Sequence, residues 1–327
     1  MATILVTGGA GYVGSHACKA LKLAGHTPVV FDNFSTGWRA AVQFGDVVEG
    51  DLLSAEDLDR AFETHRPEAV MHFAAFSNVG ESVAKPEIYW TNNVGGSASL
   101  FAATIRHGVR RVVFSSTCAT YGEPAGDTLT EADAQAPINP YGRTKLAVEH
   151  MLADLRDAHG LESVIFRYFN AAGADPARQI GEDHRPETHL IPLVLDAASG
   201  RRDAITVFGD DYPTPDGTCI RDYIHVDDLA DAHVRGLDWL LGGGASLQLN
   251  LGSGSGHSVR AVIDTARAVT GCEIPVIDGA RRPGDPARLV SGSDRARDVL
   301  GWEPTRSDLA TMIGDAWGWH QTGRYPG

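Results

Sequence analysis

The chain has 327 residues, of which 43% are hydrophobic and 21% charged, and its formal net charge is −14 at pH 7. This length suits two domains with a large buried core, and the composition excludes a disordered or fibrous protein. The negative charge argues against nucleic acid or an anionic membrane as the main partner, and no run approaches the roughly 18 apolar residues of a membrane helix.

The first residues lead directly into a glycine loop and lack a basic leader or cleavage site, so no secretory signal is expected. The four cysteines, Cys18, Cys118, Cys219 and Cys272, are scattered without CxxC or other ligand spacing. We therefore expect reduced thiols in a cytoplasmic protein.

The first half alternates short apolar runs with longer segments of helical periodicity. Strands are expected at Thr3–Val6, Thr27–Phe31, Val47–Glu49, Ala69–Phe73, Arg111–Ser116 and Glu162–Phe166. Helices are expected at Gly11–Ala24, Ser54–Thr64, Pro86–His107 and Pro140–His159, and Ser54 with Asp57 has the spacing of a capping box. Such alternation predicts a doubly wound, Rossmann-type parallel sheet in an α/β fold.

After about Asn170 the alternation loosens, and the loops 171–186 and 209–217 are rich in Gly, Pro and Asp. Helices are expected at Leu190–Ser199, Val226–Leu241, Ser258–Val269 and Asp308–His320. We interpret residues 171–327 as a smaller C-terminal α/β lobe, and residues 1–170 as the first domain, rejoined by part of 220–250.

A glycine pattern, Thr7-Gly8-Gly9-Ala10-Gly11-Tyr12-Val13-Gly14, follows the first expected strand and opens the first helix. Glycines there permit a tight turn and let the backbone approach a pyrophosphate at the helix N-terminus. The second expected strand ends in Asp32, where an acid accepts hydrogen bonds from ribose hydroxyls and repels a 2′-phosphate. The combination predicts NAD as cofactor, with Asp51 near the adenine edge.

A second glycine run, Gly252-Ser253-Gly254-Ser255-Gly256, also precedes a helix, with Asp278 beyond it. Its spacing is GxGxG rather than GxGxxG, so we interpret it as a flexible helix-capping loop.

Tyr141 and Lys145 are four residues apart on a helix that begins with Pro140, so both side chains project from one face. A cation beside a phenol lowers the pKa of the phenol and makes it a usable base near neutral pH. The run Phe114–Gly122 ends the fifth expected strand, and the hydroxyl of Thr117 at the carboxyl edge of the sheet faces the ligand crevice. Thr117, Tyr141 and Lys145 are the predicted catalytic residues.

No metal site is expected. Glu182-Asp183-His184 with His189 lacks a recognised ligand spacing, and we interpret the segment as a polar substrate loop. The GxSxG and HExxH patterns of hydrolases are absent from the sequence.

Together the TGxxGxxG and YxxxK motifs resemble those of the extended short-chain dehydrogenase/reductase family. Further motifs narrow the resemblance, across nearly the whole chain, to the UDP-hexose 4-epimerases within it. These are Phe73-Ala74-Ala75, Val79–Val83, Asn92-Asn93-Val94, Arg167-Tyr168-Phe169-Asn170, Arg221–Val226 and Arg281-Arg282-Pro283-Gly284-Asp285.

The resemblance implies that the NAD pyrophosphate is held by Gly8, Gly11, Tyr12, Val13 and Gly14. It places around the adenosine ribose Asp32, Asn33, Ser35, Thr36 and Gly37, and near adenine Asp51 and Leu52. Along the path of the cofactor it places Phe73, Ala74, Ala75 and Asn92, and at the nicotinamide end Tyr141, Lys145 and Phe169. For the UDP-sugar it implies contacts from Thr117, Tyr141, Asn170, Phe208, Arg221, Arg282 and Asp285.

The implied reaction is the NAD-dependent interconversion of UDP-glucose and UDP-galactose, by oxidation at C4, rotation of the 4-keto sugar and re-reduction. A dehydratase would need an acid pair after the strand hydroxyl, where this chain has Cys118 and Ala119. A UDP-pentose 4-epimerase remains an alternative, because the same residues would serve. So does a silent NAD-binding regulator, although such relatives typically lose the tyrosine or the lysine.

Two positions depart from the family pattern. Thr117 stands where many relatives carry Ser, and Arg288 stands where they often carry Tyr or Cys beside the sugar. The long cation leaves the sugar preference open and argues against N-acetylated hexoses. The resemblance also suggests a homodimer packed through the helices that begin near Pro86 and Pro140.

Overall fold

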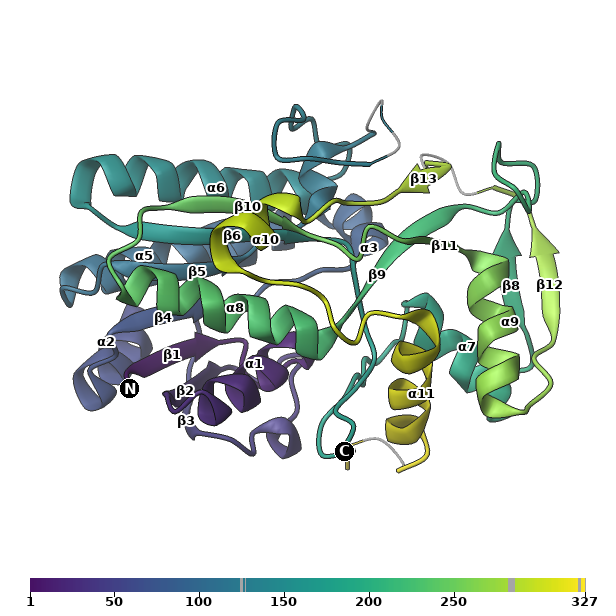
Figure 1. Ribbon diagram of the computed structural model, residues 1–327. Helices are drawn as coiled ribbons and strands as arrows, with labels where there is room; N and C mark the ends of the chain where they lie inside the picture. Colours follow the sequence, from purple (N-terminus) through teal and green to yellow (C-terminus); the bar gives the residue numbers. More distant parts are fainter. Residues whose placement is uncertain (124–125, 127, 282–285, 323–324, 327) are drawn as a thin grey trace.

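The computed structural model describes residues 1–123, 126, 128–281, 286–322 and 325–326. The larger lobe is built on a parallel sheet of seven strands in the order β10-β6-β5-β4-β1-β2-β3 (Figure 1). Its strands are β1 (Thr3–Thr7), β2 (Thr27–Asp32), β3 (Asp46–Glu49), β4 (Ala69–His72), β5 (Arg111–Ser115), β6 (Glu162–Tyr168) and β10 (Leu247–Leu251). This confirms the predicted doubly wound α/β fold.

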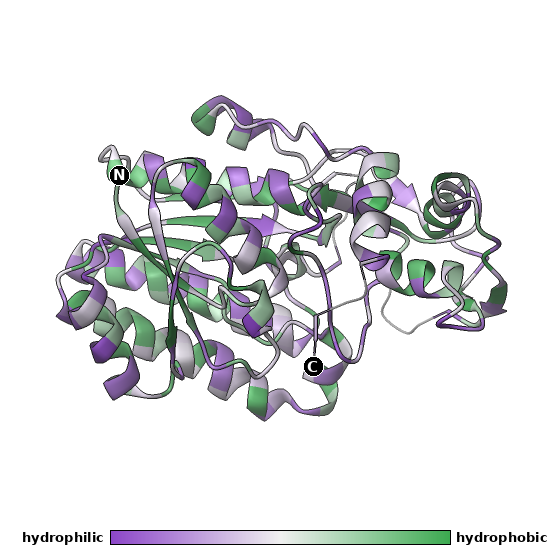
Figure 2. Ribbon diagram, turned by 90° about the horizontal axis from the view of Figure 1, so that it is seen from below, coloured by the Kyte–Doolittle hydropathy of each residue, from purple (hydrophilic) through white to green (hydrophobic). Residues whose placement is uncertain are grey.

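Alternate residues of the strands feed two hydrophobic cores, one on each face of the sheet. In β1, Ile4 and Val6 pack with α1 (Tyr12–Leu23), α8 (Val226–Leu241) and α10 (Asp294–Leu300). Leu5 points to the other face, which is covered by α2 (Ala55–His65), α5 (Gly96–Arg106) and α6 (Pro140–His159). Because both faces are covered, the strands are apolar along most of their length, as Figure 2 shows by their hydropathy colours.

The expected helix over Pro86–His107 is in fact three consecutive helical segments. These are α4 (Pro86–Tyr89), a π-helical turn η2 (Trp90–Gly95) and α5. In the widened turn, Asn93 is buried, and its side chain bonds both the amide and the carbonyl of Phe76. A periodicity reading cannot detect a π turn, since the backbone still coils and the apolar spacing shifts by a single residue. A short helix, α3 (Val79–Ala84), precedes this segment and was not predicted.

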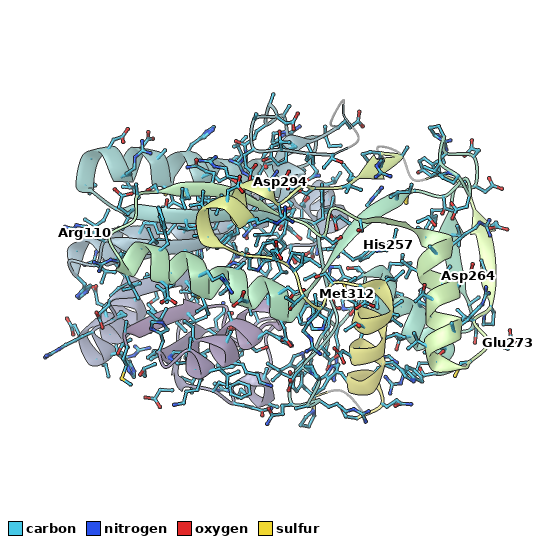
Figure 3. All side chains as sticks on the ribbon, viewed as in Figure 1. Arg110, His257, Asp264, Glu273, Asp294 and Met312 are labelled. Carbon is cyan, nitrogen blue, oxygen red and sulfur yellow. The ribbon has the colours of Figure 1, made fainter. Side chains whose placement is uncertain are left out.

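The smaller lobe contains the two-stranded parallel sheet of β8 (Ile205–Phe208) and β12 (Val276–Gly279). The helices α7 (Leu190–Ala198), α9 (Val259–Thr270) and α11 (Leu309–His320) enclose its own core, and Met312 on α11 is fully buried there. Figure 3 labels Met312 and Asp264, which is on α9.

A short sheet joins the two lobes. Its strands, none of which the sequence analysis predicted, are β7 (Asn170–Ala172), β9 (Ile220–His225), β11 (Gly256–Ser258) and β13 (Arg288–Leu289). The sequence analysis expected the glycine run Gly252–Gly256 to cap the following helix, α9, but it does not. Ser258 caps that helix through the amide of Ala261, while Asp222 accepts bonds from the amide and hydroxyl of Ser253 in the run.

Strand order identifies where a ligand binds. From β1 the chain proceeds to β2 and β3 on one side, and then crosses to β4, β5, β6 and finally β10 on the other. The order therefore reverses between β1 and β4, and such a switch point opens a crevice at the carboxyl ends of the strands. Among the described residues no helix combines the length and the apolar character needed to cross a membrane.

Candidate active site

The glycine loop lies at the switch point, between β1 and α1. Gly8 has φ +72°, and a Cβ there would stand 2.6 Å from the backbone nitrogen of Ala74, which follows β4. A Cβ on Gly14 would stand 2.1 Å from the carbonyl oxygen of Gly8, so the helix start and the loop touch directly. These contacts require glycine at both positions and bring the loop of β1 against the end of β4.

Helix α1 begins at Tyr12 without a capping side chain and without an acid in its first turn. In contrast, side chains cap α2, α6, α9 and α11. The first amides of a helix lack intrahelical partners and carry partial positive charge, so the uncapped start of α1 suits a phosphate. Gly11 and Val13 lie at this start, and the hydroxyl of Tyr12 donates to the carbonyl of Gly173 at 2.7 Å.

Asp32, at the end of β2, is buried and braces the glycine loop. Its two carboxylate oxygens accept the amides of Ala10 and Phe34, at 3.0 and 2.9 Å. Burial raises the pKa of Asp32, against the effect of these two hydrogen bonds. Each carboxylate oxygen has a second lone pair, so the side chain retains acceptor capacity for ribose hydroxyls.

The remaining residues predicted around the adenosine follow β2 and β3 on neighbouring strands. The side chain of Asn33 donates to Asp51 at 2.9 Å and accepts the amide of Ser35 at 3.0 Å. Thr36 and Gly37 follow, and a Cβ on Gly37 would stand 2.9 Å from that of Ala10 in the glycine loop. Leu52 is buried beside Gly96 at the start of α5.

Beyond the switch point, β4 ends at His72, one residue earlier than predicted, because the amides of Phe73 and Ala74 both donate to the carbonyl of Thr7. Ala75 continues this turn. The ring of Phe73 packs against His233 of α8, with 4.8 Å between the ring centroids. Asn92 lies in the π turn η2 and donates to Asn93 at 3.0 Å.

Tyr141 and Thr117 meet at the carboxyl end of β5. Thr117 directly precedes a short 3₁₀ turn, η3 (Cys118–Tyr121), and its hydroxyl accepts the amide of Ala119 at 3.1 Å. Tyr141 is in the first turn of α6, which Asn139 caps. Burial raises the pKa of Tyr141 above its ordinary value, while the nearby hydroxyl of Thr117 acts to lower it. The two predicted hydroxyls are thus brought together.

Lys145 is buried one turn further along α6. Its Nζ donates to the carbonyl oxygen of Ser115 at 2.8 Å and lies 4.9 Å from the centroid of the Phe114 ring. Burial lowers the pKa of Lys145 to about 7, and the nearby Glu149 acts in the opposite direction. In the protein alone the pKa of Tyr141 is raised rather than lowered, so the expected acidification of the phenol is not a property of the Tyr141–Lys145 pair by itself.

Beneath this pair lies a buried ion pair that the sequence analysis missed. Arg167 in β6 and Glu149 in α6 approach to 2.6 Å, with side chains only 6% and 4% exposed. Glu149 also accepts the hydroxyl of Ser116, and Arg167 donates to the hydroxyl of Tyr121. Burial acts to lower the pKa of Arg167, but the bonds to Glu149 and Tyr121 outweigh it and raise the pKa above its ordinary value.

Two further polar groups at this edge had no predicted role. The hydroxyls of Ser115 and Tyr168 share a hydrogen bond of 2.6 Å.

Part of the missed ion pair could have been found from the sequence. Glu149 follows Lys145 by four residues, which is the spacing of one helix face. The partners in β5 and β6 depend on strand pairing and have no local pattern.

The residues predicted for a substrate lie around the connecting sheet. Asn170 begins β7 and donates to the carbonyl of Asp222 in β9 at 2.9 Å, and Arg221 in β9 is partly exposed. Phe208 ends β8, and Phe169 packs against the small cluster that contains Cys118 and Tyr121. Arg282 and Asp285 lie outside the described residues.

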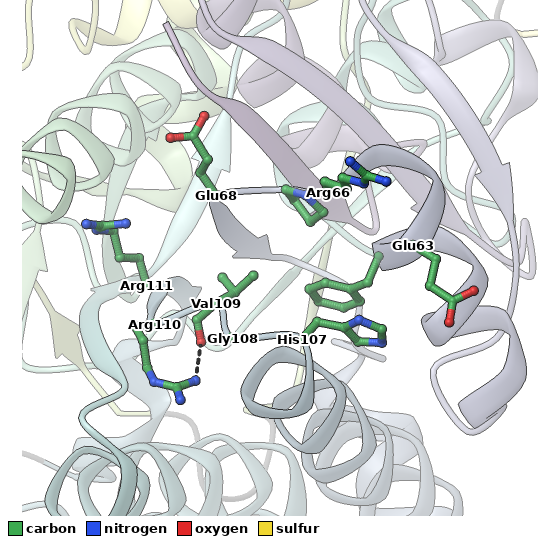
Figure 4. A pocket seen from close by; sticks show the side chains of 10 residues that line it. Glu63, Arg66, Glu68, His107, Gly108, Val109, Arg110 and Arg111 are labelled. Carbon is green, nitrogen blue, oxygen red and sulfur yellow. Dashed lines mark hydrogen bonds between the residues drawn. The ribbon is translucent and has the colours of Figure 1, made fainter.

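A separate hollow opens at the opposite edge of the large sheet, where β4 and β5 begin (Figure 4). Its lining includes Glu68 and Arg111, and the guanidinium of Arg110 is turned back onto the carbonyl of Val109 at 3.1 Å. The glycine loop and the Tyr141 region are at the carboxyl ends of the strands, so this hollow is not part of the candidate site.

An uncapped helix start at the switch point that suits a phosphate, together with a Tyr–Lys helix at the carboxyl end of β5, is typical of dinucleotide-dependent enzymes of the dehydrogenase/reductase class. The chain belongs to the NAD dependent epimerase/dehydratase family, whose model matches residues 4–252.

Individual relatives agree with this assignment. A UDP-glucose 4-epimerase of Rhizobium leguminosarum bv. trifolii is 53% identical over 97% of each chain. The crystal structure of UDP-glucose 4-epimerase from Brucella ovis in complex with NAD has 51% identity and a TM-score of 0.95, over 98% of each chain. A second structure, UDP-glucose-4-epimerase from Stenotrophomonas maltophila with bound NAD and formylated UDP-arabinopyranose, has 39% identity and a TM-score of 0.95, over 98% of each chain.

Proposed function

We propose that this chain is an isomerase that interconverts UDP-glucose and UDP-galactose by inverting C4 of the sugar, with NAD as its bound cofactor. The single observation that carries the proposal is that Tyr141 lies close to Thr117 at the carboxyl end of β5, one helical turn from the buried Lys145. Relatives named UDP-glucose 4-epimerase that match over nearly their whole length support it.

NAD fits the residues present. The uncapped start of α1 (Gly11, Tyr12, Val13) suits the pyrophosphate, with Gly8 and Gly14 shaping the loop. Asp32, Asn33, Ser35, Thr36 and Gly37 would surround the adenosine ribose, and Asp51 and Leu52 would lie near adenine. Phe73, Ala74, Ala75 and Asn92 would line the path, with Phe169 at the nicotinamide end. A bound NAD would supply the acceptor and the donor for the hydride of C4.

The side chains at the end of β5 handle the proton. Tyr141 would accept the proton of the sugar 4-hydroxyl, with Thr117 as a hydrogen-bonding bridge, and would return it after the sugar has turned over. Because burial raises the pKa of Tyr141 in the protein alone, ionisation of the phenol needs positive charge nearby. Lys145 supplies one such charge and would also hold the nicotinamide ribose.

The nucleotide end of the substrate requires firmer contacts than the sugar, since the 4-keto sugar must present both faces. Asn170, Arg221 and Phe208, from β7, β9 and the end of β8, would hold the diphosphate and uridine. Arg282 and Asp285 are assigned to the same UDP group by motif. Residues 1–170, with part of 220–250, would bind NAD, and 171–327 the UDP-sugar; β10, which joins the large sheet, supports this return of the chain.

We also infer a homodimer, formed through the helices that begin near Pro86 and Pro140. Val83 in α3 and Trp90 in η2 are exposed by 64% and 43%, and Ile138, just before α6, by 47%. Apolar side chains exposed along one helical region are typical of an interface. A cytoplasmic location fits the four free cysteines.

The decisive experiment is the Tyr141→Phe variant, assayed with UDP-galactose after its NAD content has been measured. We expect the variant to keep its NAD and to lose at least about a hundredfold in turnover, since a positioned general base contributes roughly that much or more. Unchanged turnover of UDP-galactose would overturn the proposal, and the absence of turnover in the wild type would favour a silent NAD-binding regulator.

A panel of UDP-galactose, UDP-arabinose and UDP-N-acetylgalactosamine tests the sugar. A pentose substrate is the second candidate, because the Stenotrophomonas relative holds a UDP-arabinopyranose derivative. Arg288 lies in β13, beside Ile220 of β9, and we expect it to disfavour the N-acetylated sugar. Preference for UDP-arabinose would assign the enzyme to UDP-pentoses.

A further inference from the structure

Four side chains between β7 and α7 converge in a way that the sequence spacing did not predict. Glu182, His184, Glu187 and His189 each offer one ligating atom, and these four atoms all lie within 4.8 Å of one another. The sequence analysis considered Glu182, His184 and His189 and rejected a metal site because the spacing was unfamiliar. The structure adds Glu187, which completes a set of two imidazoles and two carboxylates.

Of the four imidazole–carboxylate separations, the two from His184 are close to those of ligands around one small cation, and the two from His189 are shorter, in the range of hydrogen bonds. Nδ1 of His184 is 3.2 Å from Oε1 of Glu182 and 3.6 Å from Oε2 of Glu187. Nδ1 of His189 is 2.8 Å from Oε1 of Glu182 and 3.1 Å from Oε1 of Glu187. Zinc bonds to nitrogen and oxygen are about 2.0–2.2 Å long, so tetrahedral ligands lie roughly 3.3–3.6 Å apart.

The charges of the cluster also match a divalent cation. The side chains of Glu182 and Glu187 are only 7% and 6% exposed, and two carboxylates buried side by side require about two compensating positive charges. Both imidazoles turn Nδ1 toward these oxygens, and their ring centroids are 5.1 Å apart. Nδ1 of His184 is buried and faces the carboxylates of Glu182 and Glu187 without well-formed hydrogen-bond geometry to either, as a metal ligand would.

The backbone around the cluster is held from several sides. Trp319 in α11 donates to the carbonyl of Glu182 at 3.0 Å, and Trp38 in the loop after β2 donates to the carbonyl of Asp183 at 2.7 Å. Oε1 of Glu187 accepts the amides of Thr188 and His189 at 2.7 and 2.8 Å. Such outer contacts orient ligands before an ion arrives.

The cluster also borders the cofactor loop. The ring of His184 meets that of Tyr12, the first residue of α1, edge to face at 6.4 Å between centroids. We propose that Glu182, His184, Glu187 and His189 bind one divalent transition-metal ion of the zinc class. The ion is structural, because it fixes the segment before α7 against the start of α1, and it takes no part in the proton transfer at Tyr141.

The first test measures metal directly on the full chain, produced without a polyhistidine tag. Mass spectrometry of the purified protein measures bound zinc, manganese, cobalt and nickel. After treatment with a chelator, the protein is titrated with Zn²⁺ against a chromophoric competitor, and with Co²⁺ while the visible spectrum is recorded. We expect one ion per chain and a tetrahedral Co²⁺ spectrum of nitrogen and oxygen ligands.

Variants then assign the ion to the cluster. His184→Asn and Glu187→Gln should each weaken Zn²⁺ binding by more than about 100-fold, since loss of even an outer partner costs roughly 10–100-fold. His107→Asn is the matched control, because His107, directly after α5 and outside the cluster, also pairs with a carboxylate, Asp59, at 2.7 Å. It should bind zinc like the wild type. Circular dichroism and bound NAD check that each variant folds.

Two outcomes would overturn the proposal. One is a wild-type chain that binds no stoichiometric metal and gives no tetrahedral Co²⁺ spectrum, which would make the cluster a network of protonated histidines and carboxylates. The other is binding that His184→Asn and Glu187→Gln leave unchanged. If either variant does not fold, the Co²⁺ spectrum of the wild type alone still decides whether nitrogen and oxygen ligands surround one ion.

Discussion

The ammonium group of Lys145 donates a hydrogen bond to the carbonyl oxygen of Ser115, at 2.8 Å, and this bond fixes helix α6 to the end of strand β5. Tyr141 precedes Lys145 by one turn of the same helix. The hydrogen bond thus fixes the position of the ammonium group at the end of β5, and helix α6 fixes the position of Tyr141 relative to that group. The base of the proposed reaction depends on this arrangement.

The first prediction concerns the variant Lys145→Met. Burial lowers the pKa of Lys145 to about 7, and Glu149 acts in the opposite direction, so the lysine carries its full charge only below that pH. The phenol of Tyr141, in contrast, must lose its proton to act as a base, and a neighbouring cation favours that loss. Removal of the cation should lower kcat by about a hundredfold near neutral pH and move the rising limb of the kcat profile to higher pH. Turnover of UDP-galactose as a function of pH measures both effects. Lys145→Arg, which keeps a cation, should retain the position of the limb better, and an unshifted profile in Lys145→Met would contradict the assigned role.

The second prediction separates the hydroxyl of Thr117 from its shape. Thr117→Val keeps the volume but removes the hydroxyl, which acts to lower the pKa of the nearby Tyr141 and accepts the amide of Ala119. We expect kcat to fall by more than about tenfold and the free energy of unfolding to fall by about 1 kcal/mol through loss of the cap. Thr117→Ser should retain most of both. Steady-state kinetics and urea denaturation measure the two effects, and equal activity in the two variants would rule out a role for the hydroxyl.

The third prediction concerns Gly14. Because a Cβ would stand 2.1 Å from the carbonyl oxygen of Gly8, Gly14→Ala should displace the loop and reduce the NAD retained after purification by more than about tenfold. Gly314→Ala is the control: it also lies in a helix, α11, where the nearest neighbour of a Cβ is 3.9 Å away. That change should preserve NAD and stabilise the fold by up to about 1 kcal/mol. If Gly14→Ala retained as much NAD as the wild type, the loop would be able to accommodate the Cβ, and the prediction would be wrong.

Local patterns predicted the parts of the fold that local forces determine. The glycine loop with Asp32, and the Tyr141–Lys145 helix with its start at Pro140, follow from spacing within one supersecondary unit. Strand β10 was missed because its five residues come after a glycine-rich turn, and only pairing with β6 identifies them as a strand. The short strands of the connecting sheet were missed for the same reason.

The site required contacts that no spacing encodes. Glu149 and Arg167 are on different elements, and their pairing follows from the packing of α6 on β6. Likewise, Glu187 joins His184 in one cluster only because of the turn between them. A sequence pattern identifies which residues carry chemistry, but tertiary packing decides which of them meet.

The fourth prediction follows from that buried ion pair. Glu149→Gln would leave the guanidinium of Arg167 buried without its counter-charge, and loss of one partner of a buried pair costs about 3–5 kcal/mol. The double variant Glu149→Leu with Arg167→Met removes both charges and should recover more than half of that loss. Urea denaturation, monitored by circular dichroism, measures each free energy of unfolding. A double variant as unstable as the single one would show that the charges stabilise the fold in their own right.

The fifth prediction uses Lys19 of α1, whose Nζ lies 2.6 Å from Asp175, a carboxylate only 2% exposed. Burial acts to raise the pKa of Asp175, but the Lys19 ammonium and the amides of Gln179 and Ala177 outweigh it, so the pKa lies below the ordinary value. The folded carboxyl therefore binds its proton less readily than the unfolded one. Its stabilising effect is complete above about pH 4 and is lost as the pH falls through the folded pKa.

Lys19→Met should reduce the free energy of unfolding by about 1–2 kcal/mol at pH 7, because it removes a charged hydrogen bond but keeps most of the apolar stem. Once Asp175 is protonated the ammonium has little left to attract, so the difference between variant and wild type should shrink as the pH falls below the unfolded pKa of about 3.9. Denaturant titrations at pH 7 and at successive acidic values measure this difference. A gap that stays constant with pH would mean that Lys19 stabilises the protein through its contact with Phe44, where its ammonium lies 5.6 Å from the ring centroid, rather than through Asp175.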